Sequence, residues 1–327
     1  MERKTISANY LKTIAWHNNT LIDWANAGEQ YVLDDSKAKQ LGHDTYVFGD
    51  AAIISPDGVY SFIYKRLGTK GLLLKNGELL REINRSYYCA EVYEYPAAFV
   101  TVLDVTYLIH CPLAYNQLDF ENVETGELIA NVKKRKPSDT FYSRLEISPD
   151  NTLLMSKGWN WHPLDVIQVF KIQDCIEQPE LLDESTICPD VYGEICTASF
   201  IADDKILIGS SDEVDDDDDD TRFPPKHIAI WNLTSGEFSK PAAVNAEFGN
   251  LFAINENLAW DLFKYPKIID INTGEVIDKM EDIDSGQQKS SIIHHLENHP
   301  QIIFNRETKQ IAIAGKDKIE VLTPNIG

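Results

Sequence analysis

Short apolar runs alternate with small polar turns along the whole sequence. Runs such as Ile228–Trp231, Val166–Phe170 and Lys318–Val321 alternate or are rich in β-branched residues, and they stop at Gly, Pro, Asn or Asp. This composition and length are typical of β-strands. No long stretch follows the period of an amphipathic helix. The pattern therefore predicts an all-β protein.

Two kinds of turn recur between the runs. Ser55-Pro56-Asp57-Gly58 follows one apolar run and Ser148-Pro149-Asp150-Asn151 follows another, and Gly and Asn tolerate the positive φ of a tight hairpin. The second kind has a glycine followed by Glu, and its glycines lie 49, 110 and 38 residues apart, at Gly77, Gly126, Gly236 and Gly274. The long interval fits two units, one of which carries an insertion.

The turns divide the chain into about seven units of roughly 40 to 50 residues, the period of propeller blades with four antiparallel strands. The last unit ends on its third strand, Lys318–Leu322, and we expect Thr5–Ser7 to supply the fourth and close the ring. The prediction is a single propeller domain over residues 1–327, with an acidic loop insertion at 212–225. The units are placed near residues 10–43, 44–84, 85–135, 136–190, 191–244, 245–287 and 288–327.

Two stretches resemble the WD40 repeat family. Gly42-His43, followed by Ser55-Pro56-Asp57-Gly58, is similar to that family's landmarks in order and spacing, and Ile230-Trp231-Asn232 is similar to its tryptophan–aspartate signature, with Asn in place of Asp. The resemblance implies a diverged, bacterial-type WD40-like β-propeller. Six or eight blades stay open as alternatives to seven.

Charge narrows the classes of partner. The chain has 52 acidic and 30 basic residues, a net charge of −22, and its densest basic run is only Lys133–Lys136. Nucleic-acid binding needs clustered cations that release counterions, so it is disfavoured. No secretory signal and no apolar span long enough for a bilayer is present, so we expect a cytoplasmic protein without membrane contact. The five cysteines are unevenly spaced and are expected to be reduced.

No familiar catalytic motif is found. The pattern of His294-His295 and His299 would place two rings on one side of a helix, but the region has the pattern of strand and turn, which favours a solvated loop. Cys188, Cys196 and His227 have no recognisable ligand spacing. We therefore expect no catalytic residues, no cofactor and no metal.

The most unusual segment is a run of six aspartates, preceded by Asp212-Glu213-Val214. Like charges at this density repel one another, which predicts an extended, solvated loop. The loop could be merely solubilising, could dock a basic partner, or could bind a metal, although it lacks the Gly and the alternation of a calcium loop. The aspartates are Asp215, Asp216, Asp217, Asp218, Asp219 and Asp220.

A second candidate is Gly158–Pro163, interpreted as a polar loop that carries Trp159, Trp161 and His162. Packing between blades is one explanation for the two tryptophans. The other is an interface anchor, because exposed tryptophans contribute strongly to binding.

Blade topology brings these segments together. The connections between second and third strands open on one face of a propeller, and the tryptophan and aspartate loops are both predicted to be such connections. The same position in two further units adds Tyr115, Phe263 and Tyr265. The sequence therefore predicts an aromatic and acidic face suited to a basic protein partner.

The first hypothesis for function is a non-catalytic propeller that captures a basic protein through this face. By analogy with acidic bacterial immunity proteins, the partner could be a cognate toxin whose active site is occluded. The alternative is a propeller enzyme or small-ligand-binding protein with a site at the central channel, and a third reading is an assembly scaffold. Fold alone does not separate these classes.

Overall fold

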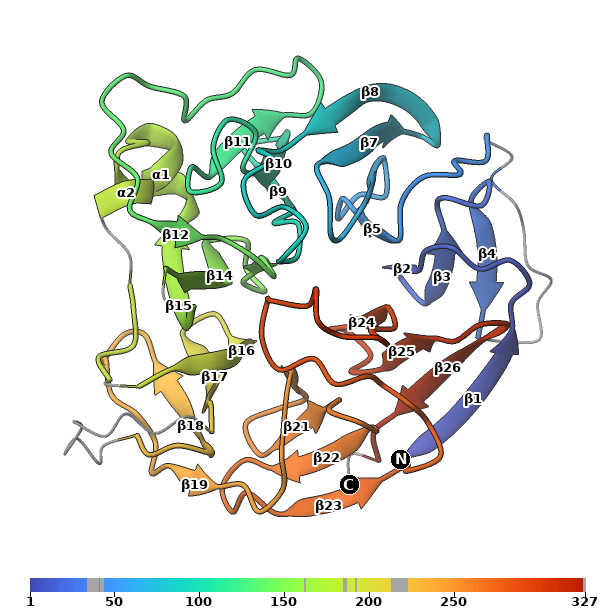
Figure 1. Ribbon diagram of the computed structural model, residues 1–327, viewed down its shortest axis with the longest axis vertical. Coiled ribbons are helices and arrows are strands. Elements are labelled where there is room, and N and C mark those ends of the chain that lie inside the picture. The colour runs from blue at the N-terminus through green and yellow to red at the C-terminus, as the bar shows by residue number, and fades with distance from the viewer. Residues whose placement is uncertain are drawn as a thin grey trace. The chain divides into compact units, whose positions relative to one another are not determined.

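The blades predicted from the turn pattern are the antiparallel sheets of the computed structural model (Figure 1). The structure describes residues 1–33, 41, 44–161, 163–184, 187–191, 193–212 and 223–325. Within these ranges, seven antiparallel sheets follow one another along the chain as the blades of a β-propeller, which confirms the predicted fold class. Of the described residues, none belongs to a helix long and apolar enough to cross a membrane.

The chain divides into two compact units. The first contains residues 1–115, 119–128 and 300–327, and the second contains residues 116–118 and 129–299. This division does not test the prediction of a single domain.

The first unit contains four of the sheets, and in all but one of their strand pairings the two strands are adjacent in sequence and form a hairpin. Two of the four have three described strands rather than the predicted four. In the third blade, the segment after the turn at Gly126 makes only one bridge, from Leu128 to Glu121. The strands are β2 (Ala15–His17), β3 (Thr20–Asp23) and β4 (Glu29–Val32); β5 (Ala51–Ile54), β6 (Tyr60–Tyr64), β7 (Lys70–Lys75) and β8 (Glu78–Asn84); β9 (Ala98–Val102), β10 (Val105–His110) and β11 (Asp119–Asn122); and β24 (Ile302–Phe304), β25 (Ile311–Ala314), β26 (Lys318–Thr323) and β1 (Glu2–Ser7).

Strand β1 completes the last blade, as the sequence predicts. It pairs antiparallel with β26, with Glu2 opposite Thr323 and Ser7 opposite Lys318. Arg3 donates two hydrogen bonds to the Glu320 carboxylate, at 2.9 and 2.8 Å, and the Thr5 hydroxyl donates a third at 2.6 Å. The first and last strands of the fold are therefore joined by both backbone and side chains.

The second unit contains three four-stranded sheets and two short helices that the sequence pattern does not reveal. The helices α1 (Ile172–Glu177) and α2 (Leu181–Glu184) follow the fourth blade directly. The strands are β12 (Thr140–Phe141), β13 (Glu146–Ile147), β14 (Leu153–Asn160) and β15 (Leu164–Lys171); β16 (Ile195–Ala202), β17 (Lys205–Ser210), β18 (His227–Asn232) and β19 (Ala242–Ala243); and β20 (Leu251–Ala253), β21 (Leu258–Asp261), β22 (Lys267–Asp270) and β23 (Val276–Lys279).

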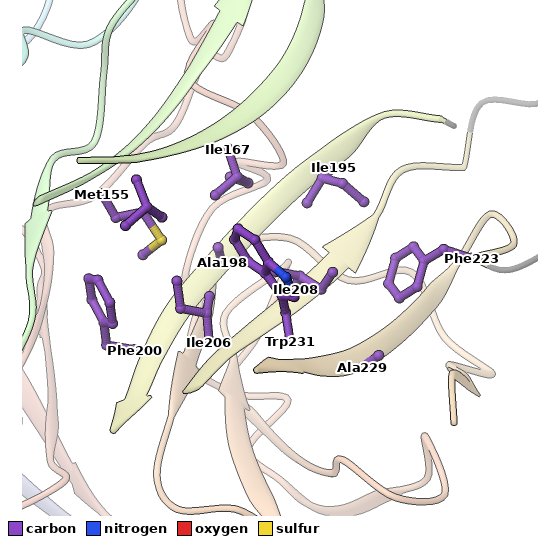
Figure 2. Close-up of a cluster of buried hydrophobic side chains, with 11 residues drawn as sticks. Met155, Ile167, Ile195, Ala198, Phe200, Ile206, Ile208, Phe223, Ala229 and Trp231 are labelled. Atoms are coloured by element: carbon purple, nitrogen blue, oxygen red, sulfur yellow. The ribbon is translucent and has the colours of Figure 1, made fainter. Parts of the chain in front are cut away.

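Apolar side chains from neighbouring blades of the second unit form a shared core (Figure 2). Met155 and Ile167 project from the β14–β15 hairpin toward Phe200, Ile206 and Trp231 of the next sheet, and all are buried. Complete burial of one such side chain contributes about 1.5 to 3 kcal/mol. The alternation seen in the sequence thus places one face of each strand against the next blade.

The backbone conformations predicted for the turns are also confirmed. Gly58 and Asn151 both have positive φ, and the hydroxyl of Ser148 donates a 2.6 Å hydrogen bond to Asp150. The four glycines of the second turn type likewise have φ between 74° and 84°. Both turn types therefore reverse the chain by the conformation that their residues favour.

Candidate binding surface

Three connections in the second unit join the second and third strand positions of their sheets, as predicted. They are the β14–β15 turn at Trp161–Pro163, the β17–β18 connection, and the β21–β22 connection at Leu262–Pro266. In the fourth sheet, β12 and β13 both pair with β14 and together occupy the first position, so β14 and β15 occupy the second and third. Most of the middle connection, together with His162, lies outside the described residues, so the predictions for His162 and for Asp215 to Asp220 are not tested. The same is true of the Gly42-His43 landmark.

The tryptophan segment differs from the prediction of a polar loop. Strand β14 continues through Trp159 to Asn160, which pairs with Leu164, so the turn holds only residues 161–163. Trp159 is 4% exposed, and its ring stacks on Phe141 at 3.8 Å between centroids with an angle of 2°. The interpretation of Trp159 as an exposed anchor is therefore wrong, because cross-strand pairing places its ring inside the fourth blade.

Trp161 is exposed beside this stacked pair. Its ring lies 6.2 Å from Trp159 and 6.1 Å from Phe141, inclined by 27° to each, and the residue is 49% exposed. Leu164, at the start of the next strand, is exposed to the same extent. The turn thus presents an apolar surface supported from below by two buried rings.

Phe263 also differs from its prediction as a surface aromatic. It is 5% exposed, and the ammonium groups of Lys264 and Lys289 lie 5.0 and 5.1 Å from its ring centroid. Cations favour the face of an aromatic ring, so the two lysines cover the apolar surface that the sequence leaves open. Phe263 therefore positions charged groups and does not itself present an apolar contact.

The remaining two aromatic candidates are half-buried. The Lys267 ammonium lies 4.5 Å from the Tyr265 ring centroid. Tyr115 belongs to the first unit, where its ring centroid lies 4.7 Å from that of Tyr88. It is therefore not assigned to the surface of the second unit.

Charged groups connect two of the loops. Lys289 lies 3.4 Å from Asp212 and 3.5 Å from Glu247, and Lys264 lies 2.6 Å from Glu247. The hydrogen bond from Lys264 lowers the pKa of Glu247 from its ordinary value. These groups are about one-third to one-half exposed, so each pair contributes little to stability. The pairs instead hold two positive and two negative groups close together on the surface of the second unit.

A cavity of about 250 Å³ opens beside these groups, and the turn that carries Trp161 contributes Pro163 to its wall. Its buried lining includes Asp165, Cys196, Ser210 and Phe248, and Glu194 is half-buried. The backbone N–H of Asp165 donates a 2.8 Å hydrogen bond to the Glu194 carboxylate. Burial raises the pKa of the Cys196 thiol, which keeps it neutral and unreactive.

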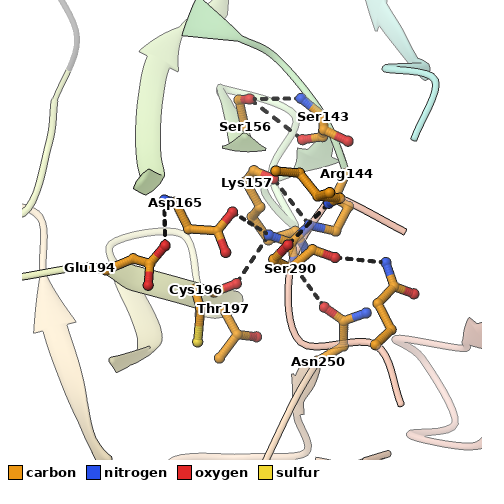
Figure 3. Close-up of polar contacts among 12 residues, drawn as sticks. Ser143, Arg144, Ser156, Lys157, Asp165, Glu194, Cys196, Thr197, Asn250 and Ser290 are labelled. Carbon is orange, nitrogen blue, oxygen red and sulfur yellow. Dashed lines mark hydrogen bonds and ion pairs between the residues drawn. The ribbon is translucent and has the colours of Figure 1, made fainter. Parts of the chain in front are cut away.

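Arg144 holds the backbone of this cavity wall in place through hydrogen bonds (Figure 3). Its guanidinium donates hydrogen bonds to the Lys157 carbonyl at 3.0 Å, the Asn250 side chain at 2.6 Å and the Cys196 carbonyl at 3.0 Å. Its distance to the Asp165 carboxylate is longer, 3.9 Å. Arg144 thus joins three segments of the second unit and orders the backbone around the cavity.

The residues that line the cavity cannot be identified from the sequence alone. Asp165 and Glu194 stand singly among strand residues, and Lys289 lies in a polar stretch without a motif. They meet only because β15 and β16 belong to adjacent blades. The only available signal is the position of Asp165 beside the tryptophan turn.

No metal-binding geometry was found in the part of the chain that the structure describes, where no group of three or more His, Cys, Asp or Glu side chains is suitably placed. His294 and His295 occupy a turn, with rings 5.5 Å apart, and not a helix. All five cysteines lie in the described ranges, and none of them forms a disulfide bond there.

Comparison with known proteins supports the fold. No family model matches the sequence, and no curated protein matches it. A chain in the crystal structure of the mitotic checkpoint complex has a TM-score of 0.60 and 12% identity, with 98% of this chain and 91% of that chain covered. At this identity the likeness concerns the fold alone, and it agrees with the β-propeller that the sheets form.

Proposed function

We propose that this protein is a non-catalytic propeller that binds a basic protein through a surface of its second unit. The observation that carries the proposal is Trp161, which is half exposed, lies against a stacked pair of buried rings and is close in sequence to exposed Leu164. A propeller of similar fold is part of a multiprotein complex, which agrees with a binding role.

The stack makes Trp161 well suited to anchor a partner. Binding usually costs free energy to immobilise side chains, and a ring already held against two others loses less freedom. Tryptophans at the centres of interfaces commonly contribute 2 kcal/mol or more. The turn that holds Trp161 is also fixed at both ends by the β14–β15 ladder.

Charge selects the class of partner. The chain carries −22, and the six aspartates Asp215–Asp220 belong to the β17–β18 connection, whose described end at Asp212 faces Lys289. A field of this sign accelerates association with a basic protein and repels an acidic one. In its more specific form, the proposal is an immunity protein whose carboxylates occupy the site that a toxin offers to an anionic substrate.

The test is affinity capture by the immobilised protein at low and high salt, with mass spectrometry of the bound fraction. We expect wild type to retain a basic protein that high salt releases, and Trp161→Ala to weaken this binding about tenfold or more. Tyr87→Ala is the control, since Tyr87 is an exposed aromatic in the first unit. Equal retention by wild type and the Trp161 variant would refute the proposal.

A further inference from the structure

We infer that the lysine segment, residues 133–136, binds a short acidic segment of the same protein partner that contacts Trp161. The inference rests on the proposed function and adds to it a second contact of opposite charge. The supporting observations are the way in which the lysine segment is anchored, the charges that it leaves unpaired, and its place in sequence next to the strand that carries Phe141.

Arg135 anchors the lysine segment. Its guanidinium donates two hydrogen bonds to the Asp183 carboxylate, at 2.8 and 2.7 Å. Two more go to the carbonyls of Leu118 and Ala130, at 2.9 and 3.1 Å. The backbone N–H of Lys136 donates to the same carboxylate at 2.7 Å, and the Arg135 side chain is only 3% exposed. The segment is thus fixed to helix α2, and the charge of its arginine is balanced.

The other three residues of the segment, Lys133, Lys134 and Lys136, are exposed. Among the described residues, no carboxylate lies within ion-pair distance of their ammonium groups. The chain has 52 acidic and 30 basic side chains, so cations without a partner are not expected to gather at one place. Apart from the anchored arginine, residues 131–139 carry three positive charges and one negative charge, at Asp139. The segment is therefore a local exception to the acidic character of the chain.

The lysine segment leads directly into strand β12, which pairs with the end of β14. The hydroxyl of Thr140 in β12 donates a 2.9 Å hydrogen bond to the Asn160 side chain. The next residue is Phe141, whose ring centroid lies 6.1 Å from that of Trp161. Five residues of extended chain span at most about 18 Å, which limits the distance between the Cα atoms of Lys136 and Phe141. One partner segment of similar length can therefore contact both the tryptophan and the lysines.

The total charge of the chain limits the ligand to a short acidic segment. Because the chain carries −22, a long polyanion such as a nucleic acid would be repelled along most of its length. Three lysines are also few for a site that binds a phosphate backbone. A peptide segment with three or four carboxylates matches the lysines within one screening length, about 8 Å at physiological salt. The rest of the partner can then be basic, as the proposed function requires.

Such a contact would fix the orientation of the partner. The overall charge of the chain attracts a basic protein, whereas the lysine segment repels basic groups nearby. Only an orientation that places an acidic segment over the lysines avoids this local repulsion. Trp161 would then supply affinity, and the lysine segment would select how the partner is placed around it.

Capture of the partner separates this contact from the effect of net charge. The double variant Lys133→Gln, Lys134→Gln changes the net charge from −22 to −24, which by steering alone would strengthen binding of a basic protein. We expect the opposite, a weakening of roughly fivefold, because two attractive pairs are lost. Stronger or unchanged capture by this variant would overturn the inference.

The matched control is the double variant Lys240→Gln, Lys316→Gln. Both lysines are exposed, neither has an ion-pair partner among the described residues, and they lie on the fifth and the last blades. Their replacement changes the net charge by the same amount. This variant should capture the partner at least as well as wild type, and an equal weakening in both variants would overturn the assignment to the lysine segment.

Direct binding is tested with defined probes on the full chain. Ligand NMR at about 0.1 M salt, where the screening length is about 10 Å, compares acetyl-tetra-aspartate amide with its neutral isostere acetyl-tetra-asparagine amide and with a DNA single strand of about 20 nucleotides. We expect only tetra-aspartate to bind. The Lys133→Gln, Lys134→Gln variant should lose this binding, and thermal unfolding should show that it is folded.

Equal binding of the two peptides, or full retention of tetra-aspartate binding by the folded variant, would overturn the inference. Tighter binding of DNA than of tetra-aspartate would overturn the choice of a protein ligand. Dimers of the wild type that the double variant no longer forms, measured by light scattering, would assign the lysine segment to a second copy of the chain and not to a partner.

The outcome is separable from that of the proposed function. If tetra-aspartate binds through the lysines while Trp161→Ala leaves capture unchanged, the lysine segment is an anion-binding surface and the proposed tryptophan surface fails. If Trp161→Ala abolishes capture while the lysine variant captures as well as wild type, the proposed function stands and the further inference fails.

Discussion

Glu320 is the residue that fastens β1 to the last blade. Arg3, Thr5 and Lys318 all donate to its buried carboxylate, and these hydrogen bonds, that of Arg3 foremost, lower its pKa from 4.5 to about 2. A carboxyl whose pKa is depressed in the folded state stabilises the fold above its unfolded value. That stability is lost as the pH falls from about 4.5 to about 2.

The corresponding prediction concerns Glu320→Gln. A shift of this size corresponds to roughly 3 kcal/mol of unfolding free energy at neutral pH, and the variant should lose most of it. Urea unfolding at pH 7 and at pH 3 measures the effect, and the loss should be much smaller at pH 3. Glu281→Gln removes an exposed pair with Lys279 and serves as the control with no expected change. An equal loss at both pH values would contradict the assignment.

At the scale of elements, the glycine turns between third and fourth strands offer a matched comparison. Gly236 and Gly274 have φ of 75° and 74° in the same kind of turn. A Cβ on Gly274 would meet the Ala243 carbonyl oxygen at 2.0 Å, whereas a Cβ on Gly236 would have nothing within 4 Å. The two sites thus share a backbone conformation and differ in their surroundings.

We expect Gly236→Ala to lower the free energy of unfolding by about 1 kcal/mol, the cost of a positive φ for a residue with a Cβ. Gly274→Ala should cost at least 1 to 3 kcal/mol more, because the backbone of the neighbouring strand must shift. Chemical denaturation of the two variants measures both values. Equal losses would show that the backbone around Gly274 accommodates a Cβ at no extra cost in unfolding free energy.

These turns also explain what the sequence could predict. Their φ values depend on residues within one hairpin, so Ser-Pro-Asp and Gly-Glu patterns located the hairpins and, with their period, the blades. The anchor prediction for Trp159 and the surface prediction for Phe263 fail because the burial of both rings depends on distant partners. Phe141 stacks on the first, and Lys289 covers the second. The cavity was missed for the same reason, since Asp165 and Glu194 meet across two blades.

On the scale of the whole molecule, the β1–β26 pairing joins segments more than 300 residues apart in sequence. Deleting residues 2–7 should expose the backbone groups of β26 as an open sheet edge. We expect the shortened chain to unfold at lower urea concentration and to form oligomers, measured by light scattering after size exclusion. A monomer with unchanged stability would show that β1 is dispensable.

This pairing also sets the order of events during synthesis. Residues 2–7 leave the ribosome before their partner strand is made, with roughly 15 to 60 s between the two segments at 5 to 20 residues per second. For that interval residues 2–7 have no strand to pair with, and the blade that they share with β26 cannot form. The speed of translation and the availability of chaperones are therefore expected to affect the yield of this protein, because the β1–β26 pair forms only after both strands have been made.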